Sequence, residues 1–167
     1  DGYFVLPYTI GNYLSNDIRT GPISTETKEF EEAEKNVRQQ IDQFINNKGS
    51  KPVDYFHKRL GKIMWNKCGM ARNEKDLKEA IEEISALRKE FYKEVLVPGD
   101  ADEFNEELAK AGRVADFLEL GELFAKDALV REESAGGHFR EEYQTADGEA
   151  QRRKEFQFVS AWEYKGE

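Results

Sequence analysis

The 167-residue sequence contains one cysteine, Cys68, and two histidines, His57 and His138. A single cysteine excludes an internal disulfide framework and fits a reducing compartment. No two of these three side chains stand at the spacing of metal ligands, which disfavours both a dedicated metal site and a Cys–His nucleophile pair. No apolar run approaches the roughly 18–20 residues of a membrane span. The chain also lacks a Gly-x-Gly-x-x-Gly or P-loop signature, so it carries no recognisable nucleotide cradle of its own.

Positive charge is in deficit, because the formal net charge at pH 7 is −9. A broad electrostatic surface for nucleic acid or for an anionic membrane is therefore disfavoured. The aromatic content of 12% and the periodic apolar positions nevertheless indicate a folded chain rather than a disordered one. A chain of this length supports one core of ordinary size, and two full domains are not expected.

Four stretches between positions 21 and 135 have the three-four spacing of apolar residues that is typical of amphipathic helices. Because long helices with short connections must pack antiparallel to bury their apolar stripes, we predict a mainly α fold, an antiparallel three- to four-helix bundle. The helices are predicted to run from about Ser24 or Thr25 to Asn47, from a Ser50 cap to Gly69, from an Asn73 cap to Pro98-Gly99, and from Asp100 or Asp102 toward Leu129.

The two ends of the chain differ from this middle part. Residues 1–20 are densely apolar and aromatic, which fits either an N-terminal helix docked on the bundle or a piece of a neighbouring domain. The first residue is Asp1 rather than Met, so we expect the chain to have been cut from something longer. Residues 136–167 are predicted to form an extended C-terminal β segment, in which 154–164 alternates as a strand. That strand needs a partner, either 138–143 or a missing continuation.

The stretch from Gly121 to Tyr143 concentrates acidic, hydroxyl, imidazole and guanidinium side chains around a break at Gly136-Gly137. Isolated acid–base chemistry is one interpretation of this cluster. The favoured interpretation is an ion-paired junction that locks a helix to the following segment or docks onto a partner, because no second convergent element accompanies it. The candidate residues of this junction are Arg131, Glu132, Glu133, His138 and Arg140.

A second notable stretch runs from Arg59 to Asn73. Gly61 inside a helix costs about 1 kcal/mol relative to Ala, which suggests close approach by another backbone or a bulky side chain, with Trp65 a plausible neighbour. Arg72 follows the helix end, where a cation meets the negative end of the helix dipole. Cys68 ends an apolar face and is expected to be a buried small hydrophobe. Core packing and a helix cap are favoured here over catalysis.

Read together, two ordered motifs resemble the C-terminal helical domain of the flavoprotein subunit of succinate dehydrogenases and fumarate reductases. The first is Arg59-Leu60-Gly61-x-x-Met64-Trp65-x-x-x-Gly69-x-x-Arg72-Asn73, and the second is Ala128-Leu129-x-Arg131-x-Glu133-Ser134-x-Gly136-x-His138-x-Arg140-x-x-Tyr143. The sequence Val159-Ser160-Ala161-Trp162-Glu163-Tyr164 looks like the tail of this family, and residues 1–18 look like the last helix of its FAD-binding domain. The resemblance covers essentially the whole chain.

The sequence departs from the family pattern at two positions. The family commonly reads Glu-Ser-Arg-Gly-Ala-His, whereas Ala135 and Gly137 stand at the third and fifth places here, so position 135 offers no guanidinium for charge pairing. The equivalent domains of L-aspartate oxidase and adenylylsulfate reductase remain alternatives. A stand-alone helical interaction module is the alternative from a different functional class.

The resemblance implies that FAD, the side chains that grip the dicarboxylate and the arginine that delivers a proton all lie upstream of this chain. We therefore assign no catalytic, cofactor-binding or metal-binding residue to it, and the isolated chain is expected to be inactive. The parent would be an FAD-dependent oxidoreductase that exchanges a hydride between succinate and the flavin and passes electrons to an iron–sulfur subunit.

The partners implied by the resemblance are the FAD-binding domain of the same subunit and the iron–sulfur subunit, with the membrane reached only indirectly through anchor subunits and no nucleic acid involved. The parent complex would be cytoplasmic and peripheral on the inner face of the cell membrane. The residues expected to serve structure or docking are Gly61, Trp65, Arg72, Arg131, Glu133, His138 and Arg140.

Overall fold

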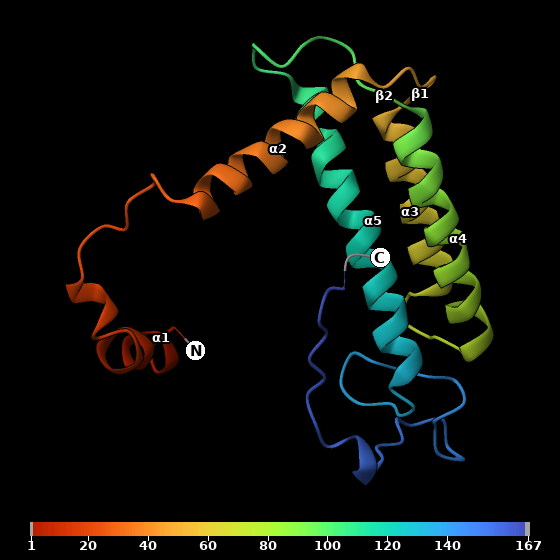
Figure 1. Ribbon diagram of the computed structural model, residues 1–167. Helices are drawn as coiled ribbons and strands as arrows, with labels where there is room; N and C mark the ends of the chain where they lie inside the picture. Colours follow the sequence, from red (N-terminus) through yellow and green to blue (C-terminus); the bar gives the residue numbers. More distant parts are fainter. Residues whose placement is uncertain (1, 166–167) are drawn as a thin grey trace. The chain divides into compact units, whose positions relative to one another are not determined.

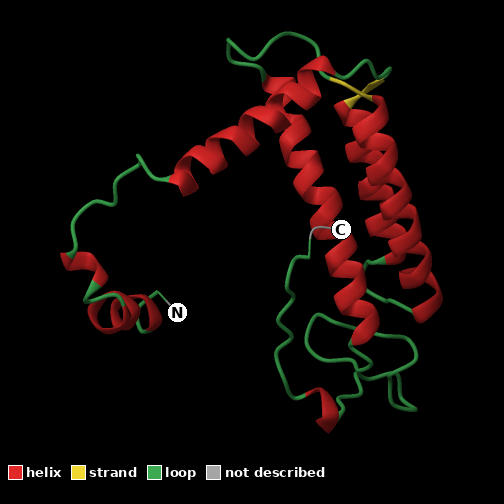
Figure 2. Cartoon of the chain, in the orientation of Figure 1, coloured by secondary structure: helices red, strands yellow, loops and turns green. Residues whose placement is uncertain are grey.

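The computed structural model describes residues 2–165, and it is mainly helical, as predicted (Figures 1 and 2). The chain divides into two compact units between Gln40 and Ile41. The helices are α1 (Val5–Tyr8), a π-helix η1 (Thr9–Tyr13), a 3₁₀ helix η2 (Asp17–Arg19), α2 (Lys28–Asn46), α3 (Val53–Lys67), α4 (Glu74–Glu94), α5 (Glu106–Val130) and a 3₁₀ helix η3 (Lys154–Phe156).

The second unit is built on α3, α4 and α5, which pack side by side (Figure 1). Strand β1 (Lys51–Pro52) directly precedes α3, and strand β2 (Val95–Leu96) directly follows α4. The two strands pair in parallel, with Lys51 opposite Val95, so α3 begins where α4 ends and these helices are antiparallel. This two-residue pair is the β-sheet of the described chain, and it lies between the helices rather than at the C-terminus.

Helix α4 forms the centre of the core of this unit, and its predicted apolar stripe is buried almost completely. Phe91 lies at its centre and makes edge-to-face contacts with Phe56 of α3 at 5.2 Å and with Phe44 of α2 at 5.7 Å between ring centroids. Such aromatic pairs contribute about 0.5–1.5 kcal/mol beyond the burial of their area. The buried residues of α4 are Leu77, Ala80, Ile84, Leu87 and Phe91.

The helix ends correct several predicted boundaries. Asn73 caps α4 as predicted, accepting the N–H of Asp76 at 2.8 Å. The cap of α5 is Asn105 rather than Asp100 or Asp102. The amide of Asn105 donates to the carbonyls of Pro98 and Asp100 and so holds the preceding loop, which delays the helix start. Helix α3 begins after Pro52 without a Ser50 cap, and α4 stops at Glu94 because Val95 pairs with β1.

The predicted apolar stripe of α2 is buried only at its end. Phe44 is buried, whereas Phe30 is 46% and Val37 is 55% exposed. None of the described residues up to position 40 is buried, because the short helices around α1 offer no second layer to cover an apolar face. Burial of the stripe is therefore confirmed at Phe44 and stays a prediction for the first half of α2, which belongs to the other unit.

The strand predicted over residues 154–164 is also absent: η3 occupies Lys154–Phe156, and the following residues up to 164 have no regular structure. The segment 138–143 is instead bridged to the start of α4, with Arg140 beside Arg72. In addition, the guanidinium of Arg131 donates to the carbonyls of Phe156 at 3.0 Å and Phe158 at 2.9 Å, which are acceptors that a neighbouring strand would have used. Side-chain hydrogen bonds thus replace the expected strand pairing.

No helix between residues 2 and 165 combines the length and the apolar character that crossing a membrane requires.

Candidate functional site

The predicted junction lies where α3 and α5 end, and Arg140 is its buried centre. The side chain of Arg140 is only 1% exposed. Its Nη1 donates to the carbonyl oxygens of Ala128 at 3.0 Å and Leu129 at 3.1 Å, and its Nε donates to Glu142 at 3.1 Å. A cation at the last carbonyls of a helix satisfies acceptors that have no partner within the helix and meets the negative end of its dipole. Arg140 therefore caps the end of α5.

Arg72 does the same for α3. Its Nε donates to the carbonyls of Cys68 at 3.2 Å and Gly69 at 3.1 Å, and its guanidinium lies 4.8 Å from the ring centroid of Phe124 on α5. The backbone of Arg72 accepts from Glu141 and donates to Phe139, which fastens the segment around Arg140 to the end of α3. Two arginines thus close two neighbouring helix ends.

His138 connects these two ends. Its Nδ1 lies 2.9 Å from Nη1 of Arg72, and its Nε2 lies 2.9 Å from the carbonyl oxygen of Arg131. Because a guanidinium only donates, Nδ1 must accept, which leaves Nε2 to carry the proton and donate to the carbonyl. Burial lowers the pKa of His138, and the nearby guanidinium groups of Arg72, Arg140 and Arg131 lower it further against the opposing effect of that carbonyl. The ring is held neutral in one tautomer.

Ser134 and Glu133 fix the loop that joins α5 to His138. The hydroxyl of the fully buried Ser134 accepts the N–H of Arg140 at 2.8 Å and donates to its carbonyl at 3.1 Å. Glu133 accepts from Arg131 at 2.9 Å and from the N–H of Arg153 at 3.0 Å. The bond from the Arg153 N–H, and then that from Arg131, lower the pKa of Glu133 against its desolvation.

The same loop reaches the first turn of α4. Glu142 accepts the N–H of Glu74, and Asn73 donates to Glu141 at 3.2 Å. Desolvation opposes the charged form of Glu142, but the hydrogen bonds from the Glu74 N–H and Arg140 hold its pKa below the ordinary value. Its carboxylate is placed at the positive end of the α4 dipole, where an anion is stabilised.

The polar side chains of this junction form their hydrogen bonds with other groups of the chain. Both ring nitrogens of His138 have partners, and so do both carboxylate oxygens of Glu133. A general base needs a free position toward the proton that it removes. Within residues 2–165, no group of three or more His, Cys, Asp or Glu is arranged to hold a metal ion. The structure therefore brings Arg72, Arg131, Glu133, His138 and Arg140 together as a locked junction.

Gly61 and Trp65 lie elsewhere, on the outer face of α3, and the expectation of core packing between them is wrong. Trp65 is 84% exposed, and a Cβ added at Gly61 would meet no atom within 4 Å. Gly121 of α5 faces the covered side of α3 instead: a Cβ there would lie 3.4 Å from Leu60 and from Met64, in ordinary van der Waals contact. The covered side of α3 carries Phe56, Leu60 and Ile63, one helix face away from Trp65.

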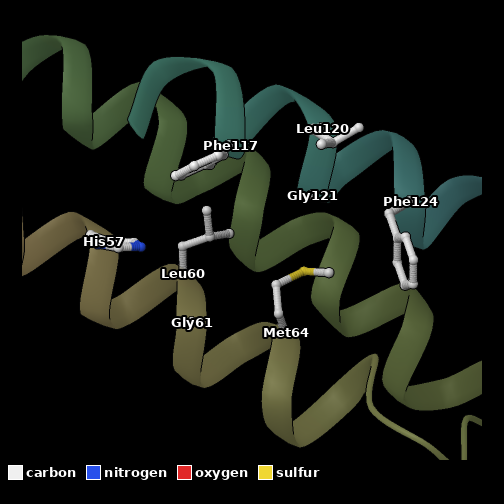
Figure 3. Close-up of a pocket in the computed structure, with 8 residues that line it drawn as sticks. All are labelled: His57, Leu60, Gly61, Met64, Phe117, Leu120, Gly121 and Phe124. Atoms are coloured by element: carbon white, nitrogen blue, oxygen red, sulfur yellow. The ribbon is translucent and has the colours of Figure 1, made fainter. Parts of the chain in front are cut away.

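Beside Gly61, α3 and α5 enclose an open apolar cavity of about 270 Å³, here called the α3/α5 groove (Figure 3). Sequence reasoning missed its α5 wall, which the spacing of apolar residues on more than one face of that helix could have indicated. The lining residues are His57, Leu60, Gly61, Met64, Phe117, Leu120, Gly121 and Phe124.

Comparison with known proteins places this arrangement in a family. Residues 57–167, more than half of the chain, match the family model described as fumarate reductase flavoprotein C-term. The fumarate reductase flavoprotein subunit of Helicobacter pylori strain J99 is 29% identical over 140 residues, which cover 84% of this chain and 20% of that protein. An uncharacterized FAD-dependent oxidoreductase of Methanocaldococcus jannaschii is 30% identical over 142 residues, which cover 80% of this chain and 25% of that protein.

Solved structures agree. The Mycobacterium smegmatis Sdh1 complex in its apo form contains a chain that is 28% identical, with a TM-score of 0.63 over 77% of this chain and 21% of that one. An Escherichia coli quinol fumarate reductase chain shares the fold, with a TM-score of 0.70, 22% identity, and coverage of 86% of this chain and 24% of that one. The present chain thus spans about a fifth to a quarter of the length of these relatives.

These matches favour the flavoprotein assignment over a stand-alone interaction module. With its capped helix ends and locked junction, the chain belongs to the fumarate reductase flavoprotein C-terminal family, as the C-terminal helical domain of a succinate dehydrogenase/fumarate reductase flavoprotein subunit.

Proposed function

We propose that this chain completes a flavoprotein subunit that interconverts succinate and fumarate, and that its own task is to buttress the FAD-binding domain and help seat an iron–sulfur subunit. The observation that supports this role is the junction itself. His138, Arg140 and Glu133 form their hydrogen bonds with backbone groups at helix ends and in the loop. Such bonding is typical of a rigid scaffold rather than of a substrate site.

In our proposal, the residues of this chain do not hold FAD. A flavin dinucleotide is commonly held by a glycine-rich turn that leads into a free helix N-terminus. Here the N-termini of α4 and α5 are capped by Asn73 and Asn105, and Glu142 adds a carboxylate at α4. In our proposal, FAD and the dicarboxylate are therefore held by a preceding domain, of which residues 1–20 are a remnant, followed by the bundle at 21–135 and the tail at 136–167.

In the proposed parent, electrons leave the flavin for an iron–sulfur subunit, and anchor subunits attach the complex to the cytoplasmic, inner face of the cell membrane. This chain contributes no membrane or nucleic-acid contact of its own. The proposal is supported by the family match and by relatives that are themselves called flavoprotein subunits.

The test compares the chain alone with the full-length subunit read from the upstream gene sequence. We expect bound flavin absorbance and succinate oxidation with a dye acceptor only for the full-length subunit. Tight FAD binding by residues 1–167 alone would overturn the proposal, and so would an upstream reading frame whose product carries no flavin.

A further inference from the structure

The α3/α5 groove is an uncovered apolar surface with an ordered shape. Phe117 and Phe124 are each 42% exposed and Leu120 is 60% exposed, all on the α5 side (Figure 3). On the α3 side, His57 lies with its ring 5.8 Å from that of Phe117. Contiguous apolar patches of this kind mark interaction sites, whereas single exposed apolar residues need no explanation.

Helix α5 is apolar on two neighbouring faces. Its first face, which includes Ala111, Leu118 and Ala125, is fully buried against the other helices. The exposed residues Phe117 and Phe124 lie beside that face, on either side of Gly121 along the helix. A helix that is apolar around most of its circumference is typical of burial on more than one side. No segment of the unit that begins at Ile41 covers the second face within the described residues, so we infer that another surface does.

Helix α3 contributes two features that favour a protein surface as the occupant. Gly61 is exposed in mid-helix, where Ala would be the better helix former, and its missing Cβ leaves the floor of the groove open to an approaching backbone. Trp65, one turn further along the same face, is 84% exposed. An exposed tryptophan beside an open apolar groove is typical of the anchor residues that dominate binding energy at protein interfaces.

We propose that the α3/α5 groove is the seat of the preceding flavin-binding domain, which inserts apolar side chains between Trp65 and Phe124. This inference rests on the proposed function. The chain spans only a fifth to a quarter of its relatives' length, and in the proposed parent the remaining length supplies a large domain of the same polypeptide at high effective concentration. A mainly apolar surface is also typical of permanent rather than transient interfaces.

The experiment is hydroxyl-radical footprinting of the full-length subunit and of the 167-residue chain. We expect Trp65, Phe117 and Phe124 to be modified several-fold more slowly in the full-length subunit. Phe104, which is 89% exposed in the loop before α5, is the internal control and should react equally in both. Equal rates for the three groove residues in the two proteins would overturn the proposal.

Variants of the full-length subunit test the same contact. Leu120→Glu and Gly61→Leu should restore fast modification of Phe124 and speed proteolysis between the domains, whereas Phe104→Glu should change neither. Circular dichroism of the same variants in the 167-residue chain checks that the bundle still folds, because both positions are exposed there. If the two groove variants fold but leave Phe124 protected, the proposal is wrong.

Other occupants give distinct results. Protection that needs the iron–sulfur subunit, or that depends on the concentration of the 167-residue chain and therefore reports a second copy, contradicts the assignment to the flavin-binding domain. The flavin content separates the two proposals. A full-length subunit without flavin contradicts the proposed function, whereas a flavin-loaded subunit with a freely reactive Phe124 contradicts only the assigned seat.

Discussion

His138 accepts a hydrogen bond of 2.9 Å from Arg72, so a neutral imidazole holds the guanidinium that caps α3. Protonation would remove the acceptor and place a positive charge beside Arg72, Arg131 and Arg140. The pKa of His138 is lowered in the folded chain, chiefly by burial, so the unfolded chain binds more protons in the window just below the ordinary value near 6.5. The stabilising contribution is therefore complete above that value and is lost as the pH falls through the folded pKa.

We predict that the free energy of unfolding, measured by urea denaturation, decreases as the pH is lowered from 7.5 to 5 and that His138→Gln weakens this dependence. At pH 7.5 the variant should lose about 1–2 kcal/mol, because two hydrogen bonds are lost or weakened. His57→Gln, at an exposed position, is the matched control. Glu133 and Glu142 have lowered pKa values, so their contributions are lost only at lower pH, below their ordinary range. An unchanged pH profile in His138→Gln would contradict the assigned protonation.

The side chain of Arg140, which caps α5, should be among those that contribute most to the unfolding free energy of the domain. Arg140→Met is expected to lower the unfolding free energy by about 3 kcal/mol, because it leaves the carbonyls of Ala128 and Leu129 and the carboxylate of Glu142 without their buried donor. Arg140→Lys should recover only part of this loss, since an ammonium cannot reproduce the planar fork. Arg113→Met, at an exposed site on α5, is the control. A loss below about 1 kcal/mol for Arg140→Met would show that the cap contributes little.

The sequence predicted what depends on local periodicity and capping. The stripe from Leu77 to Phe91 and the Asn73 cap are correct because side chains three and four positions apart share a helix face whatever the rest of the chain does. The clustering of His138 with Arg140 was also visible in the sequence. The hydrogen-bond partners of that cluster could not be predicted, because the carbonyls capped by Arg140 and Arg72 belong to helix ends that only the tertiary fold brings together.

Two sequence predictions were wrong for a different reason. Gly61 and Trp65 do lie on one helix face, as their spacing predicted, but spacing alone does not say whether that face is covered. The alternation of 154–164 predicted a strand, but the carbonyls of this tail instead accept hydrogen bonds from the guanidinium of Arg131, a long-range contact that has no sequence signature. Both errors come from long-range contacts that override a correct local pattern.

Two glycines should respond to alanine in opposite directions. A Cβ at Gly49 would lie 2.2 Å from the backbone carbon and oxygen of Glu94, and main chain at the end of α4 has little freedom to move. We expect Gly49→Ala to cost about 2–3 kcal/mol through overpacking. Gly61→Ala, with open space around the new methyl group, should instead stabilise the isolated chain by about 0.5–1 kcal/mol through better helix propensity. Thermal or urea unfolding of the two variants in parallel measures both effects, and equal signs would contradict the packing described.

Cys68 should be chemically silent in the folded chain. It is 5% exposed, and burial raises the pKa of its thiol against the opposing influence of Arg72 and Lys67. Because the thiolate is the reactive form, we expect an aromatic disulfide reagent at pH 8 to label the chain only as fast as it unfolds, and at once in urea. Rapid labelling of the native chain would show that the end of α3 opens readily.

The last prediction concerns Trp65, because its exposure reverses the usual expectation for a tryptophan. In the 167-residue chain, Trp65→Ala should change the unfolding free energy by less than about 1 kcal/mol, since few packing contacts are lost from a surface side chain. Phe91→Ala is the matched comparison, because Phe91 is 0% exposed at the centre of the aromatic cluster, and it should cost about 3–5 kcal/mol. If Trp65→Ala destabilised the isolated chain as much as Phe91→Ala, Trp65 would be a core residue and could not serve as the anchor of the α3/α5 groove. A small loss in the chain combined with weakened domain contact in the full-length subunit is the pair of results that only an interface residue gives.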